Sequence, residues 1–278
     1  MTDEDTRPDA KRVTTPSGEA WVVREEPLLI ELAEGDRVLT MRTPGHDEEL
    51  AVGFLLGEGI LSDRAELQDV EALPAGEGPE PDEDGPPVDR VRVTLRPGVE
   101  LGPVARERLS RAHAIRPSCG LCGLTSPAAL ARSLPELRPG PRVGLAELNA
   151  WGERMRAEQR TFQATGGSHA AAVFSAAGEL WGVREDVGRH NALDKVLGRC
   201  VLDGRDLSQA VVILSGRGGY ELVLKALRLR VPVVASVSAA SSLAVELADE
   251  HGATLVGFLR DGGGRVYCDD ERLREPAE

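Results

Sequence analysis

AVVILSGRGGYELVLKALRLRVPVVASVSAASSLAVELADEHGATLVGFLRDGG, residues 210–263, is the stretch that decides the fold. Short apolar runs typical of buried strands (210–214, 231–238 and 253–260) alternate with segments of about 12 residues that have the apolar spacing of helices (220–231 and 241–252). Each strand leads into glycines or serines. This alternation predicts an α/β domain with a central sheet.

The flanking sequence extends the same pattern in both directions. HAAAVFSAAGELWGVRED (169–186) predicts two strands with a turn at Ala177-Gly178, RHNALDKVLGRCVLDG (189–204) predicts a helix, and GRVYCDD (264–270) predicts a last strand. We therefore assign residues 116–278 to the α/β domain.

The N-terminal part lacks this regular alternation of strands and helices. Residues 20–43 and 88–98 predict short strands, with a hairpin turn at Gly35-Asp36, and residues 47–57 predict a helix. We expect a β-rich part over 19–115, a disordered segment over 1–18, and a disordered acidic insert over 74–87, PAGEGPEPDEDGPP.

Composition and charge exclude several classes of protein. The net charge is -13, and residues 1–103 carry 10 basic and 25 acidic side chains, so duplex nucleic acid is an unsuitable partner for the whole surface. No run of 18 uncharged apolar residues and no secretory signal are found, which predicts a soluble, cytoplasmic protein without a membrane span. Four cysteines in 278 residues do not make a disulfide scaffold.

Two of those cysteines stand in RPSCGLCGLTS (116–126). Cys119 and Cys122, at positions i and i+3 between glycines, suit half of a zinc site, a redox dithiol, or a thiolate nucleophile that carries a group. Spacing alone does not choose among the three. Cys200 and Cys268 have no partner at ligand spacing, so we treat them as bystanders and expect no metal.

Polar and glycine-rich segments that follow or precede strands supply the other candidates. Glycines let backbone N–H groups converge on an anion, a helix N-terminus adds positive potential, and arginine adds bidentate contacts. The spacings of the Walker loop and of the dinucleotide fingerprint are both absent. The candidate binding residues are His169, Arg189, His190, Asn191, Arg217, Gly218, Gly219, Phe258, Leu259, Arg260, Asp261, Gly262 and Gly263.

Taken together, the motifs resemble one family. TPGHDEELAVGFLLGEGI (43–60), SCGLCG (118–123), TGGSHAAA (165–172), REDVGRHNALDKV (184–196), LSGRGGYELVLKA (214–226) and PVVASVSAASSLAVELA (232–248) occur in that order. The chain is similar, over about residues 20–272, to the formate dehydrogenase accessory sulfurtransferases, the FdhD family. The resemblance implies a three-layer α/β/α sandwich like that of the cytidine deaminases, and a homodimer.

The resemblance also implies a function. A cysteine desulfurase would load sulfur as a persulfide on Cys119, with Cys122 assisting. The protein would bind the molybdenum bis(molybdopterin guanine dinucleotide) cofactor as a substrate, with contacts in residues 258–263, and pass sulfur to it before the cofactor enters formate dehydrogenase. The alternatives are a non-catalytic chaperone that delivers the cofactor, and a structural zinc protein.

Overall fold

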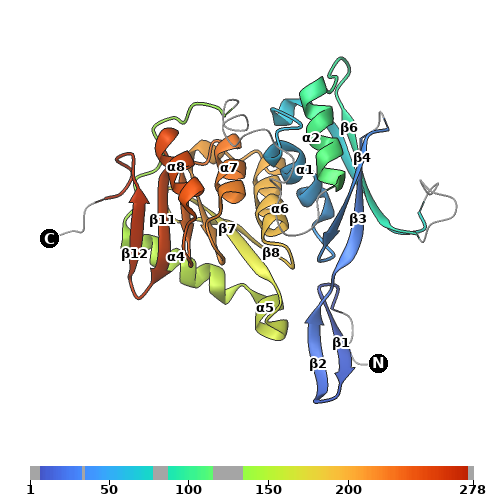
Figure 1. Cartoon of the computed structure of the whole chain (residues 1–278), viewed down its shortest axis with the longest axis horizontal. Helices are drawn as coiled ribbons and strands as arrows, with labels where there is room; N and C mark the ends of the chain where they lie inside the picture. The colour runs from blue at the N-terminus through green and yellow to red at the C-terminus, as the bar shows by residue number, and fades with distance from the viewer. Residues whose placement is uncertain (1–6, 33–34, 78–86, 115–133, 275–278) are drawn as a thin grey trace.

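The computed structural model describes residues 7–32, 35–77, 87–114 and 134–274 (Figure 1). Its centre is a six-stranded sheet with the order β12-β11-β10-β9-β7-β8. The strands are β7 (His169–Ser175), β8 (Leu180–Asp186), β9 (Ala210–Leu214), β10 (Val233–Ser236), β11 (Thr254–Arg260) and β12 (Gly263–Cys268). β9, β10 and β11 are parallel, while β7 and β12 are antiparallel to their neighbours.

Helices cover both faces of this sheet. One face packs against α4 (Leu145–Ala157), which α5 (Arg160–Thr165) follows. The other face packs against α6 (Arg189–Leu202), and α7 (Tyr220–Arg228) and α8 (Ser242–Glu250) contact each other on that side. The expected α/β class and its three layers are confirmed, while the likeness to the cytidine deaminases stays a prediction.

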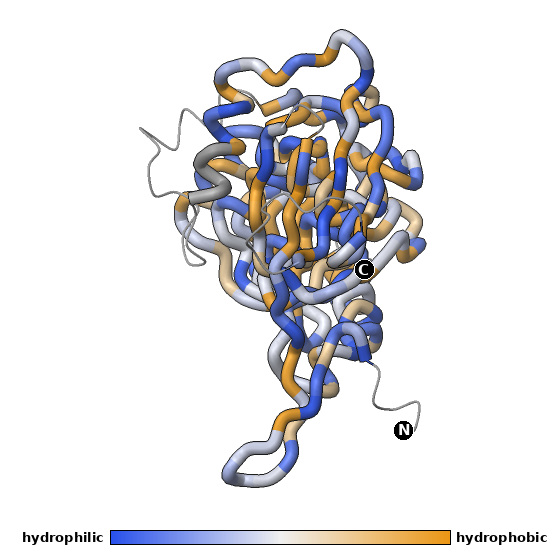
Figure 2. The backbone as a smooth tube through the Cα atoms, turned by 90° about the vertical axis from the view of Figure 1, so that its right-hand side faces the viewer, coloured by the Kyte–Doolittle hydropathy of each residue, from blue (hydrophilic) through white to orange (hydrophobic). Residues whose placement is uncertain are grey.

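The central strands are apolar on both faces because each face meets a helix layer. Val212 and Leu214 of β9 belong to the core under α6 and α7, whereas Val211 and Ile213 belong to the core under α4. Figure 2 shows the apolar segments gathered inside the body of the molecule. This two-sided burial explains why these strands read as continuous apolar runs.

The N-terminal part forms a second sheet with the order β4-β3-β6-β5. It is joined to the α/β domain through α1 and is followed by α2. These elements are β3 (Glu26–Leu32), β4 (Arg37–Arg42), α1 (Asp47–Gly57), the short 3-10 helix η2 (Arg64–Glu66), β5 (Leu67–Leu73), β6 (Asp89–Leu95) and α2 (Pro103–Ala114). α1 packs along α6, and the Glu49 carboxylate accepts hydrogen bonds of 2.5 and 2.7 Å from Arg184 of β8.

The predicted disorder of residues 1–18 is wrong for the described part of that segment. β1 (Ala10–Thr15) pairs with β2 (Gly18–Val23) in a hairpin that projects from the body (Figures 1 and 2). The Thr161 hydroxyl donates a 2.5 Å hydrogen bond to Asp9 and fastens the hairpin to α5. Backbone pairing and this tether therefore order a polar segment that buries little apolar area. Residues 1–6 and most of the acidic insert, 78–86, lie outside the described residues.

Candidate functional site

The predicted binding residues meet at one edge of the six-stranded sheet. Because β9, β10 and β11 are parallel, their carboxyl ends share that edge, and β7, which runs the opposite way, begins there with His169. β8 pairs antiparallel with β7 and ends at the same edge with Asp186 opposite His169. Ligands of open α/β sheets bind in this position. We call it the carboxyl edge.

Three helices begin at the carboxyl edge. The N-caps of α6 and α7 are Gly188 and Gly219, which have no side chain to accept from the first-turn N–H groups, and the N-cap of α8 is Ser241. Unpaired N–H groups and the helix dipole give such termini a positive potential. The backbone alone therefore makes this edge favourable for an anion.

Backbone hydrogen bonds join the glycine loop between β9 and α7 to the serine-rich loop between β10 and α8. The Gly218 N–H donates to the Ala239 carbonyl at 3.1 Å, and the Ser241 N–H donates back to the Gly218 carbonyl at 3.1 Å. A Cβ at Gly218 would lie 3.4 Å from the Ser236 hydroxyl oxygen, so this buried position has little room for a side chain. Arg217 stands exposed at the loop and leaves its guanidinium open to a ligand.

His169 lies between the basic residues of this edge. A Cβ at Gly216 would lie 3.5 Å from the Nδ1 atom of His169. Burial lowers the pKa of His169, and the charges of Arg189, Arg217 and a protonated His190 lower it further, whereas the charge of Asp186 raises it. The lowered pKa favours the neutral imidazole of His169, and the charges of Arg189 and Arg217, which add to the effect of burial, are groups that could also bind an anion.

A carboxylate that the sequence analysis missed pairs with His190. The Nε2 atom of His190 lies 2.7 Å from Oε2 of Glu221, in the first turn of α7. The hydrogen bond from His190 lowers the pKa of Glu221, and the Oε1 atom of Glu221 is buried without a hydrogen-bond partner. The motif LSGRGGYELVLKA contains Glu221, but its place in a regular helix gave no signal.

The side chain of Asn191 makes contacts that join the N-terminal part to the α/β domain. Its amide nitrogen donates to the Met41 carbonyl at 2.8 Å and to the Asp186 carboxylate at 3.2 Å. The buried Asp186 carboxylate also accepts a hydrogen bond from the Thr43 N–H at 3.0 Å, and it forms a 2.7 Å ion pair with the buried Lys195. Because the amide nitrogen is engaged, the predicted binding role of Asn191 is limited to its side-chain carbonyl oxygen.

Residues 258–263 form the hairpin between β11 and β12. Asp261 and Gly262 have φ values of 53° and 74°, as a type I′ turn requires. The guanidinium groups of Arg260 and Arg265 lie 5.6 and 5.4 Å from the ring centre of Phe258, beside a shallow depression of about 390 Å³. The Leu259 side chain is buried in the core under α4, so only the backbone of Leu259 could meet the predicted cofactor.

Cys119 and Cys122 lie outside the described residues. Of the other two thiols, Cys200 is buried, and burial raises its pKa to about 12, which makes it unreactive. Burial also raises the pKa of Cys268. Among the described residues, no group of three or more His, Cys, Asp or Glu side chains is placed to hold a metal ion. No described helix is long and apolar enough to cross a membrane.

Comparisons with known proteins agree on one family. Residues 23–274 match the model of the FdhD/NarQ family. Proteins named sulfur carrier protein FdhD from Streptomyces avermitilis and Sulfolobus acidocaldarius are 45% and 35% identical, over 91% and 92% of this chain and 88% and 92% of theirs. A crystal structure from Desulfotalea psychrophila, provisionally assigned as a formate dehydrogenase accessory protein, matches with a TM-score of 0.70. It is 25% identical and covers 95% of this chain and 97% of its own.

Proposed function

Because this chain belongs to the FdhD/NarQ family, we propose that it is a sulfur carrier. It accepts sulfur as a persulfide on Cys119 and passes it to the molybdenum bis(molybdopterin guanine dinucleotide) cofactor that formate dehydrogenase needs. The relatives named sulfur carrier proteins support the first part. The second part is our inference from the carboxyl edge.

The observation that carries the proposal is the gathering of positive groups at the carboxyl edge. The N-termini of α6 and α7 meet there with Arg189, His190 and Arg217, whose charges act together on His169. A guanine dinucleotide brings a pyrophosphate, which helix N-termini and arginines bind well. The Phe258 ring and the arginines over it offer a stacking surface for a flat base next to this site.

The loading step is a thiol exchange. The thiolate of Cys119 attacks the outer sulfur of the donor's persulfide, an S–S bond forms on Cys119, and the donor's thiolate leaves. A cysteine desulfurase is the class of enzyme that supplies such a persulfide. Cys122, three residues away, is placed in the sequence to assist or to resolve the persulfide. We propose that the chain acts in this way as a homodimer.

The test of the carrier role is the intact mass of the full chain after incubation with a cysteine desulfurase and cysteine. We expect a gain of about 32 Da, one sulfur atom, that a reductant reverses. The Cys119→Ala variant should lose this gain, whereas Cys268→Ala, which removes a half-buried cysteine outside the motif, should keep it. If neither the wild-type chain nor the control gains sulfur from an active desulfurase, the carrier role is refuted and a non-catalytic cofactor chaperone becomes the better account.

A further inference from the structure

The pair of His190 and Glu221 lies where the N-termini of α6 and α7 meet, and the proposed function gives Glu221 no role. The Nε2 atom of His190 is 2.7 Å from Oε2 of Glu221. The His190 side chain is 33% exposed, so a ligand at the carboxyl edge can reach the ring. Because Nε2 faces Glu221, the ring nitrogen that remains for a ligand is Nδ1.

This pair is the outer of two ion pairs that join α6 to α7. His190 and Asp194 are one turn apart on α6, and the residues that face them on α7 are also one turn apart. The inner pair, Asp194 with Lys225 at 2.8 Å, is buried. Lys225 also pairs at 2.7 Å with Glu58, which caps the end of α1. Facing charges therefore alternate along the two helices when His190 is protonated.

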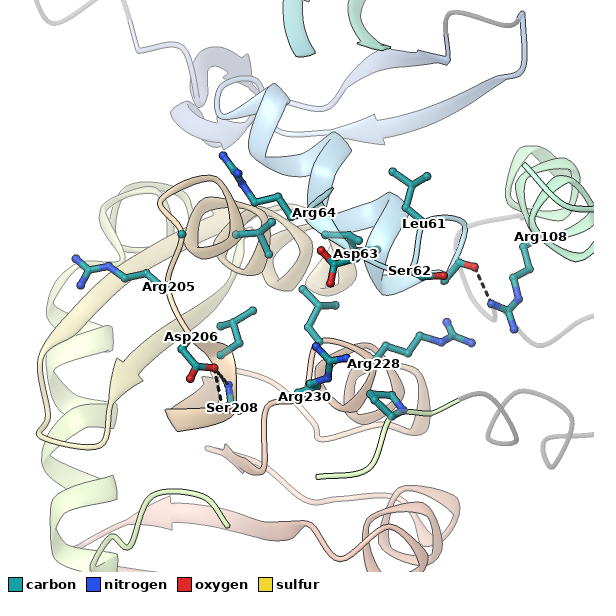
Figure 3. A pocket seen from close by; sticks show the side chains of 17 residues that line it. Leu61, Ser62, Asp63, Arg64, Arg108, Arg205, Asp206, Ser208, Arg228 and Arg230 are labelled. Atoms are coloured by element: carbon teal, nitrogen blue, oxygen red, sulfur yellow. Dashed lines mark hydrogen bonds between the residues drawn. The ribbon is translucent and has the colours of Figure 1, made fainter. Parts of the chain in front are cut away.

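The helix α7 is held against its neighbours without Glu221. Besides the pairs of Lys225, Arg228 in the last turn of α7 donates from Nη1 to the Gly57 carbonyl at 2.7 Å. Figure 3 shows Arg228 extending from the helix beside a cavity of about 520 Å³, at the opposite end of α7 from Glu221. Loss of the Glu221 carboxylate should therefore leave the helix in place, which favours a role other than fixing α7.

The position of Glu221 is unfavourable for a carboxylate with a structural role alone. Its Oε1 atom is buried and has no hydrogen-bond partner among the described residues, which costs stability. It also lies at an edge where helix N-termini and arginines favour an anion, and a carboxylate repels one. Both costs are explained if Glu221 acts through His190, whose hydrogen bond lowers the pKa of Glu221 and so keeps the carboxylate ionised.

We propose that Glu221 is a positioning residue that orients His190 toward the anion bound at the carboxyl edge. The inference rests on the proposed function, because that anion is the pyrophosphate of the guanine dinucleotide. Glu221 accepts from Nε2 of His190, and Nδ1 donates to a phosphate oxygen beside Arg189 and Arg217. Both ring nitrogens donate only in the protonated imidazole, a form that a facing carboxylate favours.

Calorimetric titration of the full chain with pyrophosphate and with guanosine diphosphate tests this role. If Glu221 only repelled anions, Glu221→Met, which keeps the length of the side chain, would strengthen binding. We predict the opposite, binding about tenfold weaker, because His190 loses its charged partner. Glu221→Gln, whose amide oxygen still accepts from Nε2, should lose less affinity. Glu246→Met, which removes an exposed carboxylate of α8, is the charge-matched control and should bind at least as tightly as the wild-type chain.

A double-mutant cycle with His190→Gln separates positioning from a general disturbance of the site. Arg189 and Arg217 remain in His190→Gln, so this variant should still bind pyrophosphate measurably. In that background Glu221→Met should not weaken binding further, whereas a disturbed helix N-terminus would weaken binding in both backgrounds. Urea denaturation checks that each variant is folded.

Equal or tighter binding of pyrophosphate by a folded Glu221→Met variant, or an equal loss in the His190→Gln background, would overturn the inference. Failure of guanosine diphosphate alone to bind the wild-type chain would contradict the nucleotide part of the proposed function, and the pyrophosphate comparison would still decide the role of Glu221. Absence of binding for both anions would contradict both. Sulfur loading at Cys119 is measured separately and does not depend on these outcomes.

Discussion

At the scale of single residues, the carboxyl edge is a place where positive charge accumulates around one neutral histidine. His169 has its pKa lowered from 6.5 by burial and by Arg189, His190 and Arg217. An anion bound to those residues would compensate their charge. His169 therefore works as an internal reporter of the site's electrostatics.

We predict that removing one of these charges raises the pKa of His169. Proton NMR titration of the imidazole should give a pKa below 6.5 in the wild-type chain and a higher value in Arg217→Met. Because the pKa of His169 is lower in the folded than in the unfolded protein, the unfolded state binds more protons at pH values between the two pKa values. The free energy of unfolding should therefore decrease as the pH falls through 6.5, and decrease less in Arg217→Met. An unchanged pKa in the variant would show that Arg217 does not face His169.

Sequence reasoning found the exposed and glycine-flanked residues of this site but not their partners. Arg217 stands out because glycines surround it after an apolar strand. Glu221 does not stand out in the sequence. Its contact with His190 arises because the N-termini of α6 and α7, at Arg189 and Tyr220, lie close together although they are 31 residues apart in the chain. Leu259 was included only as part of a continuous segment, and the alternation of β11 turns its side chain into the core.

At the scale of elements, the close packing of α1 on α6 decides how the N-terminal part is joined to the site. Gly53 and Gly198 allow this approach: a Cβ at either position would overlap the backbone of the opposite helix, at Asp194 and Glu49 respectively. The same helix pair carries Glu49 and Asn191, which bond to β8 and β4. The position of the N-terminus of α6 thus depends on two glycines.

We predict that Gly198→Ala destabilises the protein by about 3 kcal/mol, because a methyl group cannot fit between the two backbones. The matched control is Gly152→Ala in α4, where a Cβ would meet nothing within 4 Å. There the substitution should increase the free energy of unfolding by about 0.5–1 kcal/mol, since alanine favours the helix. Urea denaturation of both variants measures the difference. Equal effects would mean that α1 and α6 do not pack as closely as described.

At the scale of the whole molecule, the sequence predicted the sheet and the helix layer of α6, α7 and α8, but not the layer of α4 and α5. Apolar runs that end in glycines or serines located β9, β10 and β11, because strands buried on both faces have few polar positions. α4 was not predicted, although Leu148, Trp151 and Met155 stand at helical spacing and form its buried face, where Trp151 stacks on Phe174 with ring centres 5.2 Å apart. β1 was missed because its residues are polar and its order comes from backbone pairing with β2.

The most direct test of the central claim is calorimetric titration of guanosine diphosphate, which carries the base and the phosphate groups of the cofactor's nucleotide. We predict saturable binding to the wild-type chain, at least tenfold weaker binding to Arg217→Met, and unchanged binding to Arg205→Met, which removes an arginine remote from the carboxyl edge. If Arg217→Met binds guanosine diphosphate as tightly as the wild-type chain, the carboxyl edge is not the nucleotide site and the account is contradicted.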